Sequence, residues 1–390
     1  MITLAGGAST DSRASRPLPC GAVRGMTCAV AGVREYVEFT YGDGSAEDRE
    51  LLSWVVGQAG LLWGGGPYPF PLAPGDLTHG SYGHIAEYDL ADTLGEVFDG
   101  KLSSNDLAVR FFSNGGDACA AAVRIARAVT ARDVIATQGY HGAQSDFAHQ
   151  PAWFGYPYEN VRLHRRFEFG DSAGMAQAAR DAACIMVEVP GLDDEQAIMT
   201  FLENCRSKAD QWIIPFIIDD VVGGFRFALG GTAERYGVKP DMICLGKAMS
   251  ATGGISALIG RADLVGKLGG EVFYSTTFGG APDRCQIAND TIRWLMNHRG
   301  EVYGESGHLH IIGQALKDGL NALGVPCVGQ PERSALNFPT NTAWLDFCSR
   351  MIERGVMMHR PNFVTLAHSM RDVDETLAAA ERVVKELQTA

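Results

Sequence analysis

The chain has 390 residues, a formal net charge of −13 and a hydrophobic content of 46%. This length allows one large hydrophobic core and a second, smaller domain. An acidic surface disfavours non-specific binding to a phosphate backbone, so the composition argues against nucleic acid as a substrate.

The cysteines and the apolar runs bear on the cell compartment. Nine cysteines are scattered without the spacing of a zinc site or of a disulfide framework. No apolar run reaches transmembrane length, and the first residues lack a basic-then-apolar signal pattern. We therefore expect a cytoplasmic protein that binds neither a metal nor a membrane.

The N-terminal segment, residues 1–85, mixes short elements with loops. Residues 35–41 alternate in polarity, which predicts a β-strand, and residues 42–44 predict a turn. Residues 47–63 predict a helix. The Gly- and Pro-rich residues 63–75 predict a long loop, a kind of segment that is often functional.

From residue 86 the chain alternates strand-like and helical patterns, as expected for a parallel sheet with crossover helices. Residues 86–294 predict a large α/β domain with a mostly parallel sheet flanked by helices. Residues 295–390 predict a smaller α+β domain, shared with the N-terminal segment and closed by a helix at 373–387. The strands expected in the large domain are 108–112, 133–137, 185–188, 213–218 and 242–245, with a helix at 117–132.

Two of these strands deliver an acid and a lysine to one edge of the sheet. Residues 213–218 lead to Asp219, and residues 242–245 lead through Gly246 to Lys247, 28 positions later (247 − 219). In a parallel sheet both side chains emerge at the carboxyl edge, where open α/β folds bind ligands. The pair suits pyridoxal phosphate, since a lysine forms the Schiff base and an acid keeps the pyridine nitrogen protonated.

A longer motif surrounds this pair. Residues 219–226 read D-D-V-V-G-G-F-R, and residues 237–247 carry Gly, Pro-Asp and Gly-Lys at fixed spacing. This pattern resembles the signature of the class III, fold-type I aminotransferases, which depend on pyridoxal phosphate. Gly6–Arg13 and Asn362–Ser369 are most similar to the glutamate-1-semialdehyde aminomutase branch. The resemblance implies an aminotransferase or aminomutase that acts on a small amino compound through Lys247.

The resemblance also implies how the cofactor phosphate is held. Asn114, Gly115 and Gly116 stand in a strand-to-helix turn, where the family has Ser-Gly-Thr. Backbone amides at such a helix start bind anions. Thr277 lies in a loop that resembles the family's T-x-x-G-N-P, whose threonine reaches the phosphate of the other subunit. A homodimer is therefore implied.

Around the pyridine ring, the resemblance places Tyr140 on one face and Val221 on the other. Glu188 matches the family's glutamate at the end of a strand, and His141 follows Tyr140 in an aromatic-His-Gly motif. His141 fits either a supporting contact behind the cofactor or an ordinary turn histidine, and Val221 also fits a core position.

On the substrate side, the resemblance gives Arg13 the role of a carboxylate clamp, because a guanidinium matches two oxygens. A solvated N-terminal arginine remains an alternative. Ser81 and Tyr82 begin a segment that resembles the branch's S-[FY]-G-x-P-T-E and are candidate substrate contacts. Residues 64–76 and 358–362 depart from the family around the substrate entrance, which argues for a different, bulkier amine.

Two other functions stay open from the sequence. The same acid and lysine would serve a decarboxylase, if the substrate carboxylate stood perpendicular to the ring. A non-catalytic descendant of the fold is the third hypothesis, supported by the altered turn at 114–116 and opposed by the intact Lys247, Asp219 and Tyr140.

Overall fold

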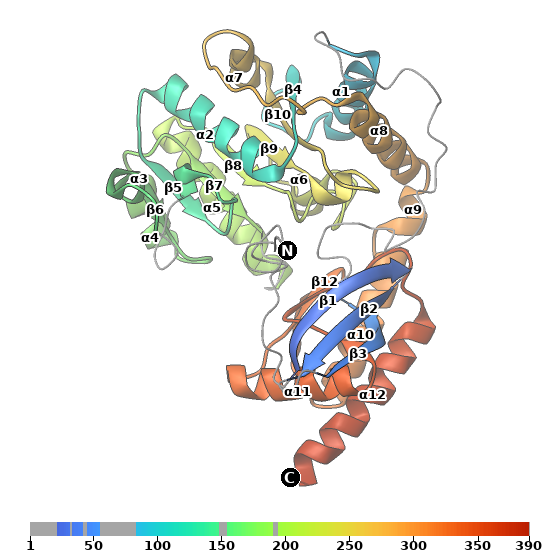
Figure 1. Ribbon diagram of the computed structural model, residues 1–390. Helices are drawn as coiled ribbons and strands as arrows, with labels where there is room; N and C mark the ends of the chain where they lie inside the picture. The colour runs from blue at the N-terminus through green and yellow to red at the C-terminus, as the bar shows by residue number, and fades with distance from the viewer. Residues whose placement is uncertain are drawn as a thin grey trace. The chain divides into compact units, whose positions relative to one another are not determined.

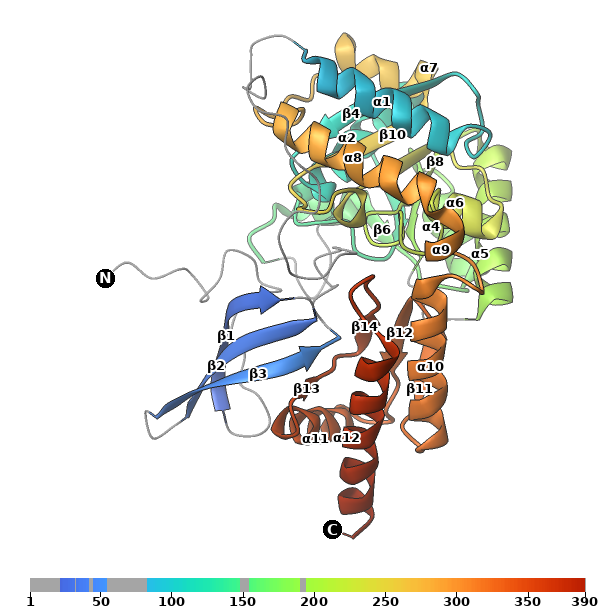
Figure 2. The same cartoon turned by 90° about the vertical axis from the view of Figure 1, so that its right-hand side faces the viewer.

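The computed structural model describes residues 22–31, 33–41, 45–54, 83–147, 154–189 and 194–389. The chain divides into two compact units, Tyr68–Gly304 and a second unit that joins Met1–Pro67 to Glu305–Ala390. Both units are drawn in Figures 1 and 2. Within the described ranges, no helix combines the length and the apolarity needed to cross a bilayer.

The larger unit is built on a sheet of seven strands within the described residues, in the order β4-β10-β9-β8-β7-β5-β6. Among these, β10 runs antiparallel to both of its neighbours, and the other pairs are parallel. The mostly parallel sheet expected from the sequence is confirmed. The strands are β4 (Leu107–Phe112), β5 (Ile135–Gln138), β6 (His164–Arg166), β7 (Ile185–Glu188), β8 (Phe216–Asp219), β9 (Met242–Leu245) and β10 (Ser256–Arg261).

Helices lie on both sides of this sheet (Figures 1 and 2). They are α1 (Ile85–Phe98), α2 (Gly115–Thr130), α3 (Tyr158–Leu163), α4 (Ser172–Ala179), α5 (Glu195–Trp212), α6 (Gly231–Tyr236), α7 (Ala262–Val265), α8 (Pro282–Asn297) and α9 (Arg299–Val302). Helices α1 and α8 run side by side in both views.

The central strands are mostly apolar because both of their faces are covered, and β7 and β8 end in the acids Glu188 and Asp219. Met186 and Ile217 pack into the core that α2 forms with the sheet. Their neighbours Val187 and Ile218 pack into the opposite core, which α4 and α5 cover. This two-sided burial explains why residues 185–188 and 242–245 could be predicted as strands to the residue.

The smaller unit contains two short sheets in its described part, β1-β2-β3-β13 and β11-β12-β14. Its strands are β1 (Ala22–Ala31), β2 (Arg34–Tyr41), β3 (Ala46–Ser53), β11 (Cys327–Gln330), β12 (Arg333–Leu336), β13 (Val356–Met357) and β14 (Pro361–Phe363). Its helices are α10 (His308–Ala322), α11 (Asn341–Glu353) and α12 (Met370–Thr389). The predicted strand at 35–41 and the predicted terminal helix at 373–387 are confirmed by β2 and α12.

The helix predicted for residues 47–63 is wrong where the structure describes it. Residues 46–53 form β3, which pairs antiparallel with β2 and parallel with β13. The helical expectation rested on Ala, Glu, Arg and Leu, and such propensities are weak beside tertiary pairing. Leu51 and Leu52 are completely buried in the strand. The turn expected at 42–44 and the loop expected at 63–75 lie outside the described residues.

A tryptophan anchors the smaller unit. The Trp54 ring stacks on His368 with centroids 4.1 Å apart, and its Nε1 donates to Thr376 Oγ1 at 2.8 Å. His368 Nδ1 accepts from the Thr365 amide at 3.0 Å, while its Nε2 lies 3.2 Å from the Ser53 carbonyl. The family-like segment around His368 therefore supports packing inside this unit.

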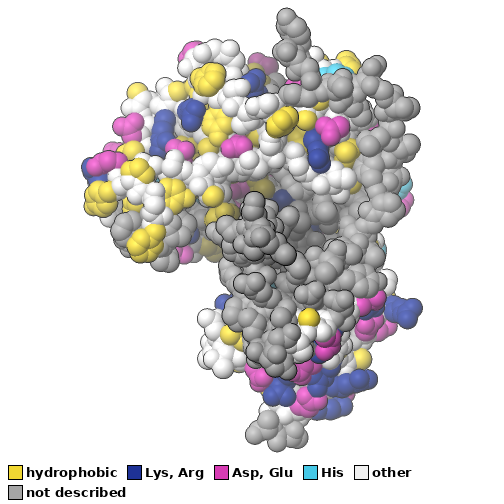
Figure 3. Space-filling model, viewed as in Figure 1, with side chains coloured by type: hydrophobic (Ala, Val, Ile, Leu, Met, Phe, Trp, Pro, Cys, Tyr) yellow, Lys and Arg dark blue, Asp and Glu magenta, His cyan; other side chains and the backbone are white. Residues whose placement is uncertain are grey.

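Charges of both signs are interspersed on the described surface. In the space-filling view, Lys and Arg side chains lie among Asp and Glu side chains rather than in one basic stripe (Figure 3). Pairs such as Arg206 with Asp210, and Arg261 with Asp263, are examples of this mixing.

Candidate functional site

The carboxyl ends of five strands meet at one edge of the large sheet. Strands β7, β8 and β9 are adjacent and parallel, with Glu188 opposite Asp219 and Asp219 opposite Cys244. Because β10 is antiparallel to both β4 and β9, the end of β4 lies at this edge as well. The edge therefore gathers the turn after β4, the loop after β5, Glu188, Asp219 and the turn that holds Lys247.

Asp219 ends β8 and is almost completely buried, with 4% of its surface exposed. Its Oδ2 accepts a hydrogen bond from His141 Nδ1 at 2.8 Å, and its Oδ1 accepts one from the Val221 amide at 3.2 Å. Donation from Nδ1 to a carboxylate leaves Nε2 of a neutral His141 without a proton. That Nε2 is buried and meets no hydrogen-bond partner among the described residues.

The loop after β5 brings His141 to Asp219. Gly139 and Gly142 adopt φ values of 102° and 110°, which a side chain would strain. Tyr140, between Gly139 and His141, is 65% exposed and so is not a core residue. Its backbone amide donates to Glu188 Oε2 at 3.2 Å, which ties the loop to the end of β7.

Lys247 follows β9 in a left-handed backbone conformation, with φ of 44°. Non-glycine residues seldom adopt this region, and such strain concentrates at functional sites. The side chain is half-buried, while the next two residues are buried. Gly246 leaves no room for a side chain, because an added Cβ would lie 2.8 Å from Ser256 Oγ and 3.3 Å from Val221 Cγ1.

The turn after β4 starts the sixteen-residue helix α2. Asn114 caps the helix, since its Oδ1 accepts from the Asp117 amide at 3.0 Å. Gly115 and Gly116 hold the first two positions, whose amides have no partner within a helix. Among the described residues these two amides meet no acceptor. A Cβ on Gly115 would lie 2.7 Å from Val221 Cγ2, so this turn and the segment after β8 are in close contact.

Two carboxylates near the site have structural partners. Asp220 is buried, and both of its oxygens accept from Thr232, from the amide at 2.8 Å and from the hydroxyl at 2.7 Å. Burial raises the pKa of Asp220 to about 7, although the Thr232 bonds oppose the shift. The Asp220 side chain therefore links the end of β8 to the start of α6.

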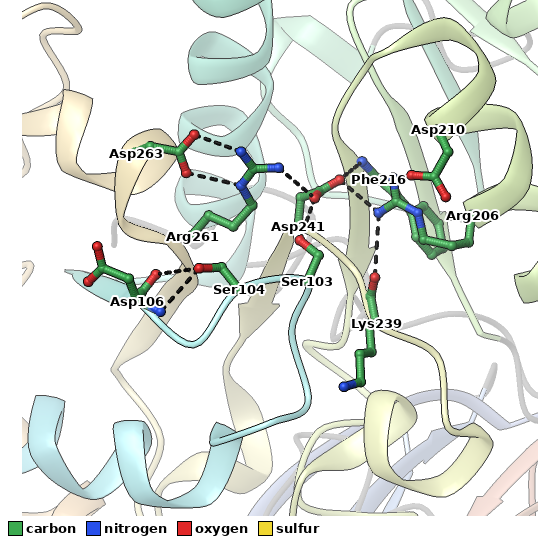
Figure 4. Close-up of polar contacts among 10 residues, drawn as sticks. All are labelled: Ser103, Ser104, Asp106, Arg206, Asp210, Phe216, Lys239, Asp241, Arg261 and Asp263. Atoms are coloured by element: carbon green, nitrogen blue, oxygen red, sulfur yellow. Dashed lines mark hydrogen bonds and ion pairs between the residues drawn. The ribbon is translucent and has the colours of Figure 1, made fainter.

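Asp241 precedes β9 and contacts Phe216 at the start of β8, so it lies at the ends of these strands away from Asp219 and Lys247 (Figure 4). Its Oδ2 accepts from the Phe216 amide and from Arg206, both at 2.8 Å, and its Oδ1 accepts from Ser103 Oγ at 2.5 Å and Arg261 at 3.4 Å. Burial alone would raise the pKa of Asp241, but these donors outweigh burial and hold its pKa below the ordinary value. The carboxylate fixes the two strands that present Asp219 and Lys247.

The structure thus brings most of the predicted site residues to one edge: Asn114, Gly115, Gly116, Tyr140, His141, Glu188, Asp219, Val221 and Lys247. Thr277 is exposed on a separate loop of the same unit. The predicted substrate contacts Arg13, Ser81 and Tyr82 lie outside the described residues. Sequence reasoning missed Gln144, whose Nε2 donates to Asp117 Oδ1 at 3.2 Å, and the supporting role of Asp241. A proline-aspartate pair before a strand was the signal for Asp241.

These groups fit pyridoxal phosphate. The amides of Gly115 and Gly116 offer donors to a phosphate at the start of a helix. Asp219 is a buried carboxylate, and its donors His141 and the Val221 amide carry no fixed positive charge. Such a carboxylate is stabilised by a cationic partner, which a protonated pyridine nitrogen provides. Lys247, which follows the neighbouring strand β9, carries an amine of the kind that could form the Schiff base.

Comparisons with known proteins were made by sequence and by structure. The family model described as aminotransferase class-III matches residues 177–360. A glutamate-1-semialdehyde 2,1-aminomutase from Methanothermobacter thermautotrophicus is 30% identical over 324 residues, covering 72% of this chain and 75% of its own length. An enzyme of the same name from a Polaromonas species is 28% identical, covering 91% of this chain and 90% of its own length.

Solved structures share the fold at lower identity. An omega-transaminase from Sphaerobacter thermophilus superposes with a TM-score of 0.77 at 18% identity, covering 99% of this chain and 95% of its own. A β-phenylalanine aminotransferase from Variovorax paradoxus gives a TM-score of 0.76 at 18% identity, covering 99% of this chain and 92% of its own. Both matches extend over nearly the whole chain.

Proposed function

The chain belongs to the class III aminotransferase family and is a pyridoxal-phosphate-dependent enzyme of the aminotransferase and aminomutase type; on that premise we propose that Lys247 and Asp219 are its catalytic residues. One observation carries this assignment. Strands β8 and β9 are adjacent and in register, so Asp219 and Lys247 leave the same edge of the sheet. The bound cofactor supplies a conjugated ring that takes up negative charge from the carbon next to the substrate nitrogen.

Asp219 holds the ring nitrogen in its protonated form. Its burial makes the carboxylate a strong partner for a cation, because little water competes. His141 is a positioning residue in this proposal. Its Nδ1–H donates to Oδ2 at 2.8 Å while the Val221 amide donates to Oδ1 at 3.2 Å, so the carboxylate is held in one orientation. Tyr140 and Val221 would cover the ring faces, and Glu188 holds the Tyr140 loop through its amide.

Lys247 is the covalent anchor of the cofactor and the base of the reaction. Once a substrate amine has released it, Nζ would take up the proton from the substrate's α-carbon and would give it up again during the transfer. The short turn that begins at Lys247 holds the backbone of this residue, since the Ser250 amide donates to its carbonyl at 3.1 Å. A fixed backbone limits the positions that Nζ can take at this edge of the sheet.

The amides of Gly115 and Gly116, with Asn114, hold the phosphate, and Thr277 of the other subunit completes its shell in a homodimer. Class III enzymes are typically dimeric, and the exposure of Thr277 supports this placement. Arg13, Ser81 and Tyr82 are proposed on the substrate side from their match to the family motifs. The substrate is then a small amino compound with a carboxylate. Seven cysteines, from Cys119 to Cys348, are free and buried, which supports a cytoplasmic location.

Turnover of amino compounds by purified variants tests this proposal. Lys247→Ala is expected to abolish amine transfer, and Asp219→Asn to slow it by at least about 100-fold, as for the loss of a tuned catalytic group. His141→Phe is expected to have a smaller effect, since Asp219 remains. Wild-type rates in Lys247→Ala would contradict the proposal. Release of carbon dioxide instead of a carbonyl product would identify a decarboxylase at the same site.

A further inference from the structure

The loop that carries Thr277 is fixed at its base to helix α2. The Tyr274 hydroxyl donates to Asp117 Oδ1 at 3.2 Å, and the Arg124 guanidinium lies 4.6 Å from the centre of the Tyr274 ring. Arg124 Nη1 also donates to the Phe273 carbonyl at 2.7 Å. Two successive residues of the loop are therefore held by side chains of one helix.

Asp117 belongs to the turn assigned to the phosphate. Its Oδ2 accepts from Asn114 Nδ2 at 2.5 Å, and its Oδ1 accepts from Gln144 Nε2 at 3.2 Å as well as from Tyr274. One carboxylate thus joins the phosphate turn, the segment after the Tyr140–His141 loop and the base of the Thr277 loop.

Tyr274 is held from a third side as well. Its ring meets the edge of Phe112 at 5.6 Å with an interplanar angle of 88°, and Phe112 ends β4 immediately before the phosphate turn. Burial and the neighbouring charge of Asp117 raise the pKa of Tyr274 to about 12, so the hydroxyl stays a donor at neutral pH. Beyond this anchor the loop projects outward: Thr277 is exposed and Phe278 is 63% exposed.

We propose that Tyr274 is a positioning residue for the cofactor site of the other subunit, because its bond to Asp117 fixes the loop that presents Thr277 across the dimer. The inference rests on the proposed function, and it adds a residue that the family motif does not contain. Its consequence is that each phosphate turn also anchors the loop that serves the neighbouring site. Tyr274 acts through Thr277 and does not touch the cofactor itself.

Mixed dimers made from two differently tagged chains test the proposal. In the first dimer, one chain carries both Tyr274→Phe and Lys247→Ala, and the other chain is unaltered. The only site with an intact lysine is then on the unaltered chain, and the loop that reaches this site carries Tyr274→Phe. In the second dimer, Tyr274→Phe is on the chain with the intact lysine, and the other chain carries Lys247→Ala alone. The readout is the dissociation constant of pyridoxal phosphate. It is measured from the absorption band of the lysine-bound cofactor, and each dimer can form this band at only one of its two sites.

The proposal predicts that affinity falls about fivefold in the first dimer and changes by less than about twofold in the second, the size expected for one hydrogen bond at a partly exposed loop. Tyr274→Phe keeps the ring on Arg124, so the fold is expected to persist. Equal loss in both dimers, loss in the second alone, or no loss in either would overturn the proposal. Tyr303→Phe is the matched control, because it removes a hydroxyl that donates to the Phe225 carbonyl at 2.8 Å. It is expected to leave the cofactor affinity of both dimers unchanged.

Thr277→Ala in the same two arrangements separates this proposal from the proposed function. If Thr277→Ala lowers cofactor affinity in the first dimer while Tyr274→Phe does not, the loop does reach the other site and the role of Tyr274 is refuted. If Thr277→Ala has no effect on the first dimer, the loop does not serve the other site, and both assignments of this loop are refuted.

Discussion

Removal of the Asp241 side chain is expected to destabilise the larger unit strongly, because this buried carboxylate links the starts of β8 and β9. In Asp241→Ala, the buried Phe216 amide loses its acceptor and Ser103 loses its partner, while Arg206 keeps Asp210. A buried donor left unsatisfied costs about 1–3 kcal/mol, and breaking a buried ion pair costs about 3–5 kcal/mol in all. We therefore expect a loss of about 3–5 kcal/mol, which is roughly 6–20 °C in melting temperature for a unit of this size.

Thermal unfolding followed by circular dichroism measures this loss. Asp210→Ala is the matched control, because it removes the other, mostly exposed partner of Arg206 and is expected to cost less than about 1 kcal/mol. The pKa of Asp241 is lowered in the folded state, so its contribution is present above the ordinary value of 3.8 and fades as the pH falls below it. A variant that melts within about 2 °C of the wild type at neutral pH would refute the reasoning.

Three further predictions concern single contacts. Burial raises the pKa of Asp220 from 3.8 to about 7, so the free energy of unfolding should fall by about 3 kcal/mol between pH 4 and pH 7. Urea titrations at several pH values measure this fall, and Asp220→Asn should abolish it. Gly115→Ala places a Cβ 2.7 Å from Val221 Cγ2 and should cost about 1–3 kcal/mol, which Val221→Ala should restore in the double variant. Trp54→Phe removes the bond to Thr376 Oγ1 and should lower the stability of the smaller unit by about 1–2 kcal/mol, as measured by denaturant unfolding; unchanged unfolding would show that this bond adds nothing.

Five strands of the large sheet, β4, β5, β7, β8 and β9, were predicted from the sequence, because burial on both faces gives the central strands apolar runs. Residues 185–188 and 242–245 are the clearest cases. Prediction failed at residues 46–53, where pairing with β13, some 300 positions later, decides the structure and leaves no local pattern. Strands β6 and β10 were not predicted, and neither was the antiparallel direction of β10, which depends on how the chain returns to the sheet.

In the site, too, contacts between residues far apart in the sequence could not be predicted. Asp219 and Lys247 could be placed at one edge because each follows an expected strand directly. The bond from His141 to Asp219 joins residues 78 positions apart, so the sequence left His141 between two roles and the structure brings it to the carboxylate. The anchoring of Tyr274 by Asp117, 157 positions away, gave no signal beyond its nearness to Thr277.

The most direct test of the account is to identify the residue that binds the cofactor. The purified protein would be loaded with pyridoxal phosphate, reduced with borohydride, digested with a protease and examined by mass spectrometry. We expect the reduced cofactor to be attached to the peptide that contains Lys247, and to be absent from digests of Lys247→Ala. Attachment to a different lysine, or no attachment after loading, would contradict the assignment of Lys247 and of the sheet edge it shares with Asp219.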